Sequence, residues 1–158
     1  MPRFDPTTLP GSQQVRCWGL NNSGQVGNGT IVNALVPTAV TMGATRFYSA
    51  TVVTGAAHSC GLDATGAAYC WGRNTSGELG TGVASASSNV PVAVTGGLIF
   101  RSLSLGENFT CGVTGAPGTS SQVVGTIYCW GNNQFGQLGT GNATSILAPT
   151  AGRVLGQP

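Results

Sequence analysis

One short phrase occurs three times in this chain and limits the folds open to it. Each copy has Cys-Trp-Gly followed a few residues later by a Gly-x-x-Gly-x-Gly run. The copies start at Cys17, Cys70 and Cys129, and the steps between their tryptophans are 53 and 59 residues. Repeats of this length are typical of propellers and solenoids, in which each unit depends on its neighbours for a core. A residue present in every copy is therefore expected to serve packing.

Short strand-forming runs bounded by turn residues fill the chain between these phrases. They cover residues 15–18, 47–53, 58–62, 67–71, 90–94, 99–105, 109–113 and 126–130. No helical periodicity survives the glycines, so the sequence predicts an all-β protein of antiparallel meanders. Residues 1–14 contain three prolines and no periodicity, which predicts an extended arm preceding a repeat domain at 15–158.

Low charge separates this chain from several functional classes. Only 6% of its residues are charged, it has no lysine, and its formal net charge is +2. This balance argues against a nucleic-acid surface, and no apolar run is long enough for a transmembrane helix. The first residues lack the apolar core of a signal peptide. The Gly-, Ser-, Thr- and Asn-rich composition instead favours an extracellular or virion protein, and a phage structural protein would need no signal.

The repeated phrase resembles the regulator-of-chromosome-condensation repeat, over residues 15 to 152. The resemblance rests on Trp-Gly-x-Asn-x-x-Gly-Gln-Leu-Gly in register three times, with Asn22, Asn74 and Asn133 near the Asn position, although the first and third units have two adjacent asparagines. A second pattern, Gly-x-x-His-Ser/Thr-Cys-Gly-Leu, is present at residues 55–62, whereas the third unit has Phe109 at the histidine position. The resemblance implies blades of a β-propeller, of the cysteine-rich bacterial or phage kind. The guanine nucleotide exchange known in the family is not implied, because only scaffold residues match.

The number of units predicts an incomplete or open propeller. The family usually closes a ring of about seven blades, whereas this chain has three phrases and two complete hairpins. The first unit lacks a strand before residue 15, so we expect unpaired edges that recruit another chain. Residues 1–14 are a candidate for the segment that reaches across. The alternative is that the chain is a fragment of a longer closed propeller.

Four of the five cysteines are predicted to form two disulfides. A three-residue hairpin loop at 64–66, with Gly66 left-handed, places Cys60 directly opposite Cys70 on neighbouring strands. Cys111 and Cys129 occupy the same two positions in the next unit. The alternative is that all four are buried free thiols, since cysteine packs well in cores.

Cys17 has no cysteine at the matching position of its own unit. It is expected to be a free thiol or to bond a cysteine of a neighbouring molecule. A metal site is not expected, because the chain has no Cys-x-x-Cys motif and no Cys/His cluster.

No catalytic residue, cofactor or metal is expected. His58 is the only histidine. Ser59 and Asp63 are close to it in sequence, but adjacent residues of a strand face opposite sides, so a catalytic group is not indicated. The Gly-Asn-Gly and Gly-Thr-Gly runs lack the lysine and helix of a phosphate loop and are expected to be turns. Trp18, Trp71 and Trp130 are expected to pack blades together, although each could also stack on a ligand.

These observations predict a non-enzymatic structural or interaction module that works in a homo-oligomer or a larger extracellular or virion assembly. Its partners are expected to be proteins, including copies of itself, with no nucleic acid and no membrane insertion. The alternative is a secreted binding domain that recognises a protein or glycan through its blade-top loops.

Overall fold

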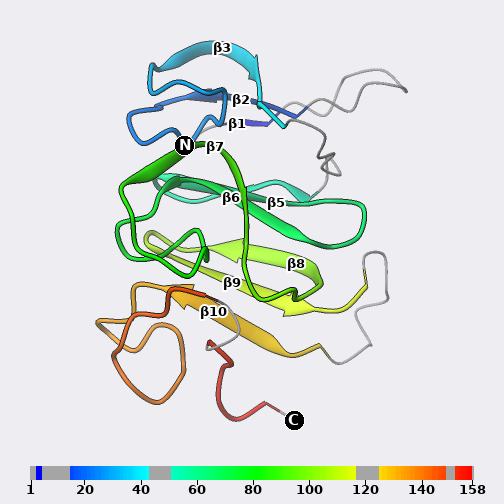
Figure 1. Ribbon diagram of the computed structural model, residues 1–158, viewed down its shortest axis with the longest axis vertical. Helices are drawn as coiled ribbons and strands as arrows, with labels where there is room; N and C mark the ends of the chain where they lie inside the picture. The colour runs from blue at the N-terminus through cyan, green and yellow to red at the C-terminus, as the bar shows by residue number, and fades with distance from the viewer. Residues whose placement is uncertain (1–2, 5–14, 43–50, 117–124, 149–151, 158) are drawn as a thin grey trace.

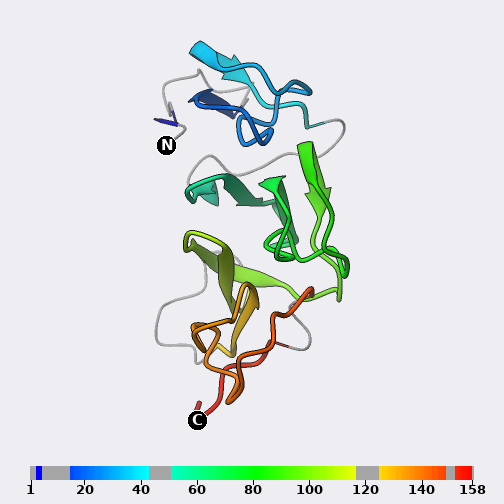
Figure 2. The ribbon, with the colours of Figure 1, turned by 90° about the vertical axis from the view of Figure 1, so that its left-hand side faces the viewer.

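Three antiparallel sheets are stacked along the long axis of the molecule (Figure 1). The computed structural model describes residues 3–4, 15–42, 51–116, 125–148 and 152–157. We call the sheets blade 1 (β1-β2-β3), blade 2 (β4-β5-β6-β7) and blade 3 (β8-β9-β10). The strands are β1 Arg3–Phe4, β2 Arg16–Gly19, β3 Ala34–Ala39, β4 Val53–Thr54, β5 His58–Leu62, β6 Ala68–Arg73, β7 Ser87–Ala93, β8 Phe100–Leu105, β9 Phe109–Thr114 and β10 Ile127–Gly131. The turned view shows the blades one above another (Figure 2), as in consecutive propeller blades.

Blade 2 contains the hairpin that the sequence predicts. Gly66 is left-handed at φ 86°, and the Asp63 amide donates to the Ala67 carbonyl at 3.0 Å. The Asp63 carboxylate accepts hydrogen bonds from the Thr65 amide at 2.8 Å and hydroxyl at 2.7 Å, which rigidifies the turn. The resulting register pairs Cys60 with Cys70.

Blade 1 corrects the prediction for the start of the chain. The sequence predicted no strand before residue 15, but β1 pairs with β2, with Phe4 opposite Cys17. An edge expected to recruit another chain is therefore paired within the same chain over these two residues. The remainder of the predicted arm, residues 1–2 and 5–14, lies outside the described residues.

The outer strand β3 was missed from the sequence. Its residues Ala-Leu-Val-Pro-Thr-Ala lack the polar–apolar alternation of a half-buried strand, and they contain Pro37. Proline cannot donate a ladder hydrogen bond, so it fits the outer edge of the blade, as Pro91 does in β7. The pairing of β2 with β3 is interrupted by a bulge between Cys17 and Gly19.

Blade 3 follows the same plan, with its outer edge formed by isolated bridges. Gly131 pairs with Ile146, and Tyr128 pairs with Arg153. Residues 47–50 of the run predicted at 47–53 lie outside the described residues, and the strand β4 covers Val53–Thr54.

The apolar core lies within and between the blades. Trp71 of blade 2 belongs to a cluster with Val15, Cys17 and Val26 of blade 1. Trp130 of blade 3 packs with Leu62 and Ala68 of blade 2, and with Phe100 of its own blade. Burial of one large apolar side chain stabilises a fold by about 1.5–3 kcal/mol. Trp71 therefore joins blade 2 to blade 1, and Trp130 joins blade 3 to blade 2.

Candidate functional site

A buried asparagine organises the loop of each repeated phrase. The Asn74 side chain accepts a hydrogen bond from the Leu79 amide at 3.0 Å and donates to the Val83 carbonyl at 3.0 Å. Asn133 makes the same bonds in blade 3. In blade 1 the equivalent residue is Asn21, not Asn22, because Asn21 bonds the Val26 amide at 2.9 Å. The loops are consequently fixed platforms on which another blade can rest.

One backbone carbonyl in this loop receives the next blade. The carbonyl of Gln25 accepts hydrogen bonds from the Trp71 indole and the Ser59 hydroxyl, both at 2.9 Å. The carbonyl of Glu78 does the same for Trp130 and Thr110, both at 3.0 Å. The two junctions share the same chemistry, so this carbonyl defines a docking point for the blade that follows.

Glycines make the close approach of the blades possible. A Cβ on Gly27 would lie 2.6 Å from the indole nitrogen of Trp71, and one on Gly80 would lie 2.6 Å from that of Trp130. The Gly29 amide donates to the Asn89 carbonyl, and the Gly82 amide to the Leu147 carbonyl, both at 2.9 Å. The first and second repeated phrases are therefore shaped to the blades that cover them.

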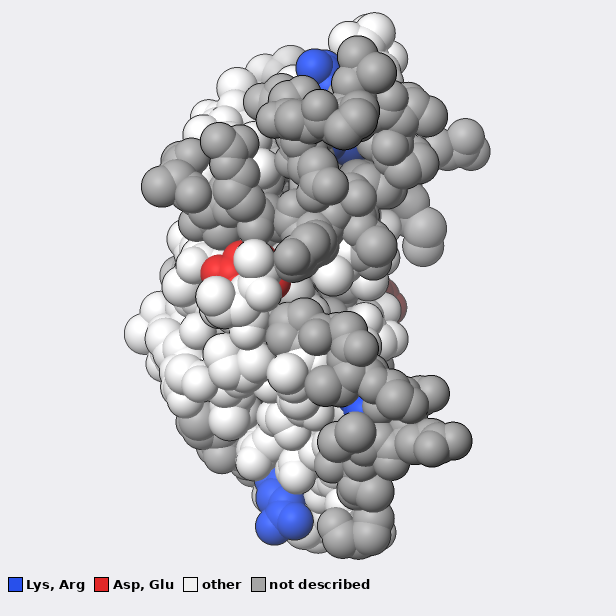
Figure 3. Space-filling view, turned by 90° about the vertical axis from the view of Figure 1, so that its right-hand side faces the viewer, with Lys and Arg blue, Asp and Glu red and all other residues white. Residues whose placement is uncertain are grey.

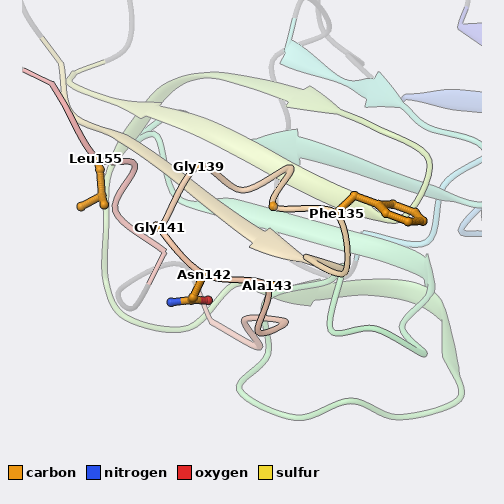
Figure 4. A pocket seen from close by; sticks show the side chains of 7 residues that line it. Phe135, Gly139, Gly141, Asn142, Ala143 and Leu155 are labelled. Atoms are coloured by element: carbon orange, nitrogen blue, oxygen red, sulfur yellow. The ribbon is translucent and has the colours of Figure 1, made fainter.

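The third phrase has no blade over it among the described residues. A Cβ on Gly136 would meet nothing within 4 Å, and one on Gly139 would meet only Val154. An open depression of about 570 Å3 lies here (Figure 4), between Phe135 and Leu155. Phe135 is 82% exposed and Leu155 is 65% exposed.

On the opposite side of the stack, no blade of the described residues covers blade 1. Trp18 is only half-buried, whereas Trp71 and Trp130 are completely buried. Leu35 on β3 is 91% exposed. The sequence did not indicate either end surface, although the replacement of a serine by Phe135 in the third phrase was a visible signal.

His58 is placed for packing between blades 2 and 3. Its ring is buried, and Nε2 lies 3.0 Å from the Thr110 hydroxyl. Because that hydroxyl donates to the Glu78 carbonyl, Nε2 must carry the proton. Burial, and then the charge of Arg73, lower the pKa of His58 to about 4. Neither nearby polar residue hydrogen-bonds the His58 ring: the Ser59 hydroxyl donates to the Gln25 carbonyl, and the Asp63 carboxylate accepts from the Thr65 amide within its own turn.

A buried ion pair occupies the loop of blade 2. Arg73 Nε donates to Glu78 Oε1 at 3.0 Å, and the Glu78 side chain is completely buried. The Ser76 amide donates to the other carboxylate oxygen at 2.7 Å. In blades 1 and 3 a glutamine takes the place of Glu78, so the charge is a local variation on a structural position.

The structure joins Cys60 to Cys70 and Cys111 to Cys129 by disulfides. Cys17 is a free thiol and is completely buried in the blade 1 core. Burial raises the pKa of Cys17 to about 12, so the reactive thiolate is disfavoured. This placement argues against the intermolecular bond that the sequence left open.

Charged groups are sparse on the described surface. Figure 3 shows isolated arginine and acidic side chains among the uncharged described residues of one face. Among the described residues no three His, Cys, Asp or Glu side chains are grouped as metal ligands. In the same part of the chain, no helix has the length and apolar character needed to cross a membrane.

Sequence comparison agrees with this repeat structure. The regulator of chromosome condensation (RCC1) repeat matches residues 14–62, 65–113 and 124–156, and a second form of it matches residues 50–78. The chain belongs to the RCC1 repeat family. The resemblance predicted from the three phrases is confirmed, and so is the all-β fold of open propeller blades.

Several relatives contain this repeat within longer chains. Human E3 ubiquitin-protein ligase HERC2 is 27% identical over 144 residues, covering 89% of this chain and 3% of its own. The Protein RCC2 homolog of Danio rerio is 34% identical over 65% of this chain and 20% of its own. The Ultraviolet-B receptor UVR8 of Arabidopsis thaliana is 28% identical over 84% and 28%. This RCC1-repeat chain thus spans less than a third of each relative.

Solved structures show the same fold. Yeast RCC1 (Prp20), in a crystal structure bound to Kap60, superposes with a TM-score of 0.74 at 21% identity, over 92% of this chain and 34% of that one. Human WBSCR16 gives a TM-score of 0.68 at 21% identity, over 87% and 34%. The three sheets therefore correspond to consecutive blades of an RCC1-type propeller.

Proposed function

We propose that this chain is a non-enzymatic structural and interaction module, working in a homo-oligomer or a larger extracellular or virion assembly. The observation that carries the proposal is the pair of end surfaces that no described blade covers, with exposed Leu35 on blade 1 and exposed Phe135 on blade 3. Large exposed apolar side chains grouped on a rigid platform mark sites of protein association. The scarcity of charge makes an apolar protein surface the better fit than nucleic acid.

The chemistry-bearing side chains support a scaffold rather than an enzyme. His58, Thr110 and Glu78 are bound to one another across the junction of blades 2 and 3. Related propellers bind proteins, since the structures of yeast RCC1 are described with Kap60 and with its binding to Gsp1p and histones. We extend only the class of partner, protein, to this chain.

The two disulfides support an oxidising compartment. Disulfides persist in extracellular proteins and on virions, and they are rare in a reducing cytosol. This argument, with the low charge of the chain, is the basis for placing the assembly outside the reducing cytosol.

The native mass tests the proposal. We expect light scattering of the oxidised protein to give a multiple of 15.8 kDa that does not fall at high salt. The same measurement with reductant separates association through folded surfaces from association through thiols. A mass of one chain at every soluble concentration would refute self-assembly.

A monomer would favour the second candidate, a secreted domain that binds a protein or glycan through its loops. Its supporting observation is the exposure of Ile31, Val32 and Val83 in the loops of blades 1 and 2.

A further inference from the structure

The contacts between consecutive blades recur closely enough to specify what a missing neighbour must supply. At both junctions the incoming blade provides a tryptophan indole, a backbone carbonyl and a residue that lies on a glycine. The receiving blade provides a backbone carbonyl, an amide and two glycines with positive φ. We call these two groups of residues the incoming set and the receiving set. Blade 3 has a receiving set, and blade 1 has an incoming set.

The receiving set of blade 3 is vacant in the described residues. Gln137 is equivalent to Gln25 and Glu78, yet no described side chain donates to its carbonyl. Gly136 and Gly139 are equivalent to the two glycines that an incoming blade covers at each formed junction, and neither meets a neighbouring blade. Gly141 takes the place of Gly82, whose amide donates across the junction.

Residue register identifies the incoming group on blade 1. The glycine after each tryptophan pairs across its sheet with Ala34, Ser88 or Ile146, and the next residue is Leu35, Asn89 or Leu147. Asn89 lies on Gly24 and Leu147 lies on Gly77. Leu35 is the third member of this set, and no blade formed by the described residues lies beneath it.

Side-chain chemistry at the two surfaces is matched. Phe135 is equivalent to Ser23 and Ser76 of the other two phrases. Leu155 is equivalent to Thr41 and Thr95, because the amide of each donates to the matching glycine carbonyl of its phrase. The uncovered receiving surface is thus more apolar than the covered ones. The incoming surface also has leucine where blade 2 has Asn89, so an apolar pair would meet.

We propose that blade 1 of one molecule docks on blade 3 of a second copy, head to tail, by repeating the internal blade junction. This inference rests on the proposed function and specifies the contact between copies in the proposed homo-oligomer. Leu35 would lie on Gly136 beside Phe135, and its carbonyl would accept from the Gly141 amide. The Trp18 indole would lie against Gly139 and donate to the Gln137 carbonyl. Such a contact joins unlike surfaces, and it produces rings when its rotation closes.

Arginine substitutions at exposed positions test the contact without disturbing the core. We expect Leu35→Arg alone, and Phe135→Arg alone, to reduce the native mass to that of one chain. Val83→Arg is the matched control. Val83 lies in the loop of blade 2 and stays exposed although blade 3 packs on that loop, so it lies outside the blade junction. This variant should keep the mass of the unmodified protein. Unchanged thermal unfolding at low concentration, where all chains are monomeric, verifies that each variant is folded.

Mixing the two defective variants gives the sharpest result. Leu35→Arg retains an intact blade 3 surface, and Phe135→Arg retains an intact blade 1 surface, so one junction can form between them. We expect a twofold increase in mass, to a one-to-one pair, and no growth beyond it. Quenching of Trp18 fluorescence by acrylamide should decrease on mixing.

The outcomes separate this inference from the proposed function. An oligomer whose mass neither variant changes would overturn the head-to-tail contact and leave the assembly function standing. Recovery of the full oligomer, instead of a pair, would also overturn it. An unmodified protein with the mass of one chain would overturn both.

Discussion

The Glu78 carbonyl is the point at which three side chains of blades 2 and 3 are connected. It accepts from Thr110 and Trp130, and Thr110 in turn accepts from His58. His58 Nδ1 is buried and has no hydrogen-bond partner among the described residues. Protonation of this nitrogen would create a buried charge near Arg73, which explains the lowered pKa of the ring.

Stability should therefore depend on pH through His58. Its pKa falls from 6.5 to about 4 on folding, so the unfolded chain takes up the proton first as the pH falls. The free energy of unfolding should decrease between pH 6.5 and 4, by up to about 3 kcal/mol, and this contribution is complete above pH 6.5. Urea unfolding measured at several pH values gives the profile.

His58→Phe supplies the comparison, because Phe109 occupies this position in blade 3. Subtracting its profile removes the contribution of the carboxyl groups. If the two profiles were parallel between pH 4 and 6.5, the argument from the buried ring would be wrong.

A second residue-scale prediction concerns the buried ion pair. Arg73→Asn removes the cation from a buried carboxylate and should destabilise the fold by about 1–3 kcal/mol. Arg73→Asn with Glu78→Gln recreates the pair of blade 3, where Gln137 donates to Asn132 at 2.8 Å. We expect the double variant to recover most of the loss in chemical denaturation. A double variant no more stable than Arg73→Asn would refute the equivalence of the two loops.

At the scale of elements, the sequence predicted those features that depend on residues close together in the chain. The hairpin of β5 and β6 depends on five consecutive residues around Gly66, so its register was readable. The strand β3 was not, because an outer strand is defined by its partner β2 and not by alternation. The receiving surface of blade 3 could not be predicted from the sequence either. The role of the Gln137 backbone carbonyl is inferred only from the hydrogen bonds that the equivalent carbonyls of Gln25 and Glu78 accept in the structure.

The disulfides provide the prediction at this scale. Peptide mapping of protein never exposed to reductant should recover Cys60 linked to Cys70, Cys111 linked to Cys129, and Cys17 unlinked. Closing loops of 10 and 18 residues should stabilise each hairpin by roughly 3 kcal/mol in the chain-entropy model. Recovery of four alkylated thiols in place of the linked pairs would contradict this assignment.

Replacement of both members of one pair measures its contribution separately. The double variant Cys60→Ala with Cys70→Ala should unfold at lower urea concentration than the unmodified protein. Cys17→Ala is a matched control for loss of a buried sulfur without loss of a bond.

For the whole molecule, neighbouring blades stabilise one another, so equivalent residues should differ in their contribution to stability according to whether another blade covers them. In repeat proteins stability is approximately a sum of unit and interface contributions. Within the part of the chain that the structure describes, blade 2 has a blade on both sides, whereas blades 1 and 3 each have a blade on one side only. Equivalent glycines of the second and third phrases allow this difference to be measured.

Gly80 and Gly139 are a matched pair with nearly the same backbone, at φ 67° and 64°. Alanine at either position carries the same left-handed strain of about 1–2 kcal/mol. On Gly80 the added methyl would also collide with Trp130, whereas on Gly139 it would meet only the Val154 side chain, at 3.1 Å. We therefore expect Gly80→Ala to destabilise the monomer clearly more than Gly139→Ala. Both should be measured by urea unfolding in the Phe135→Arg background, which removes association, and equal losses would show that the Trp130 contact does not join blade 3 to blade 2.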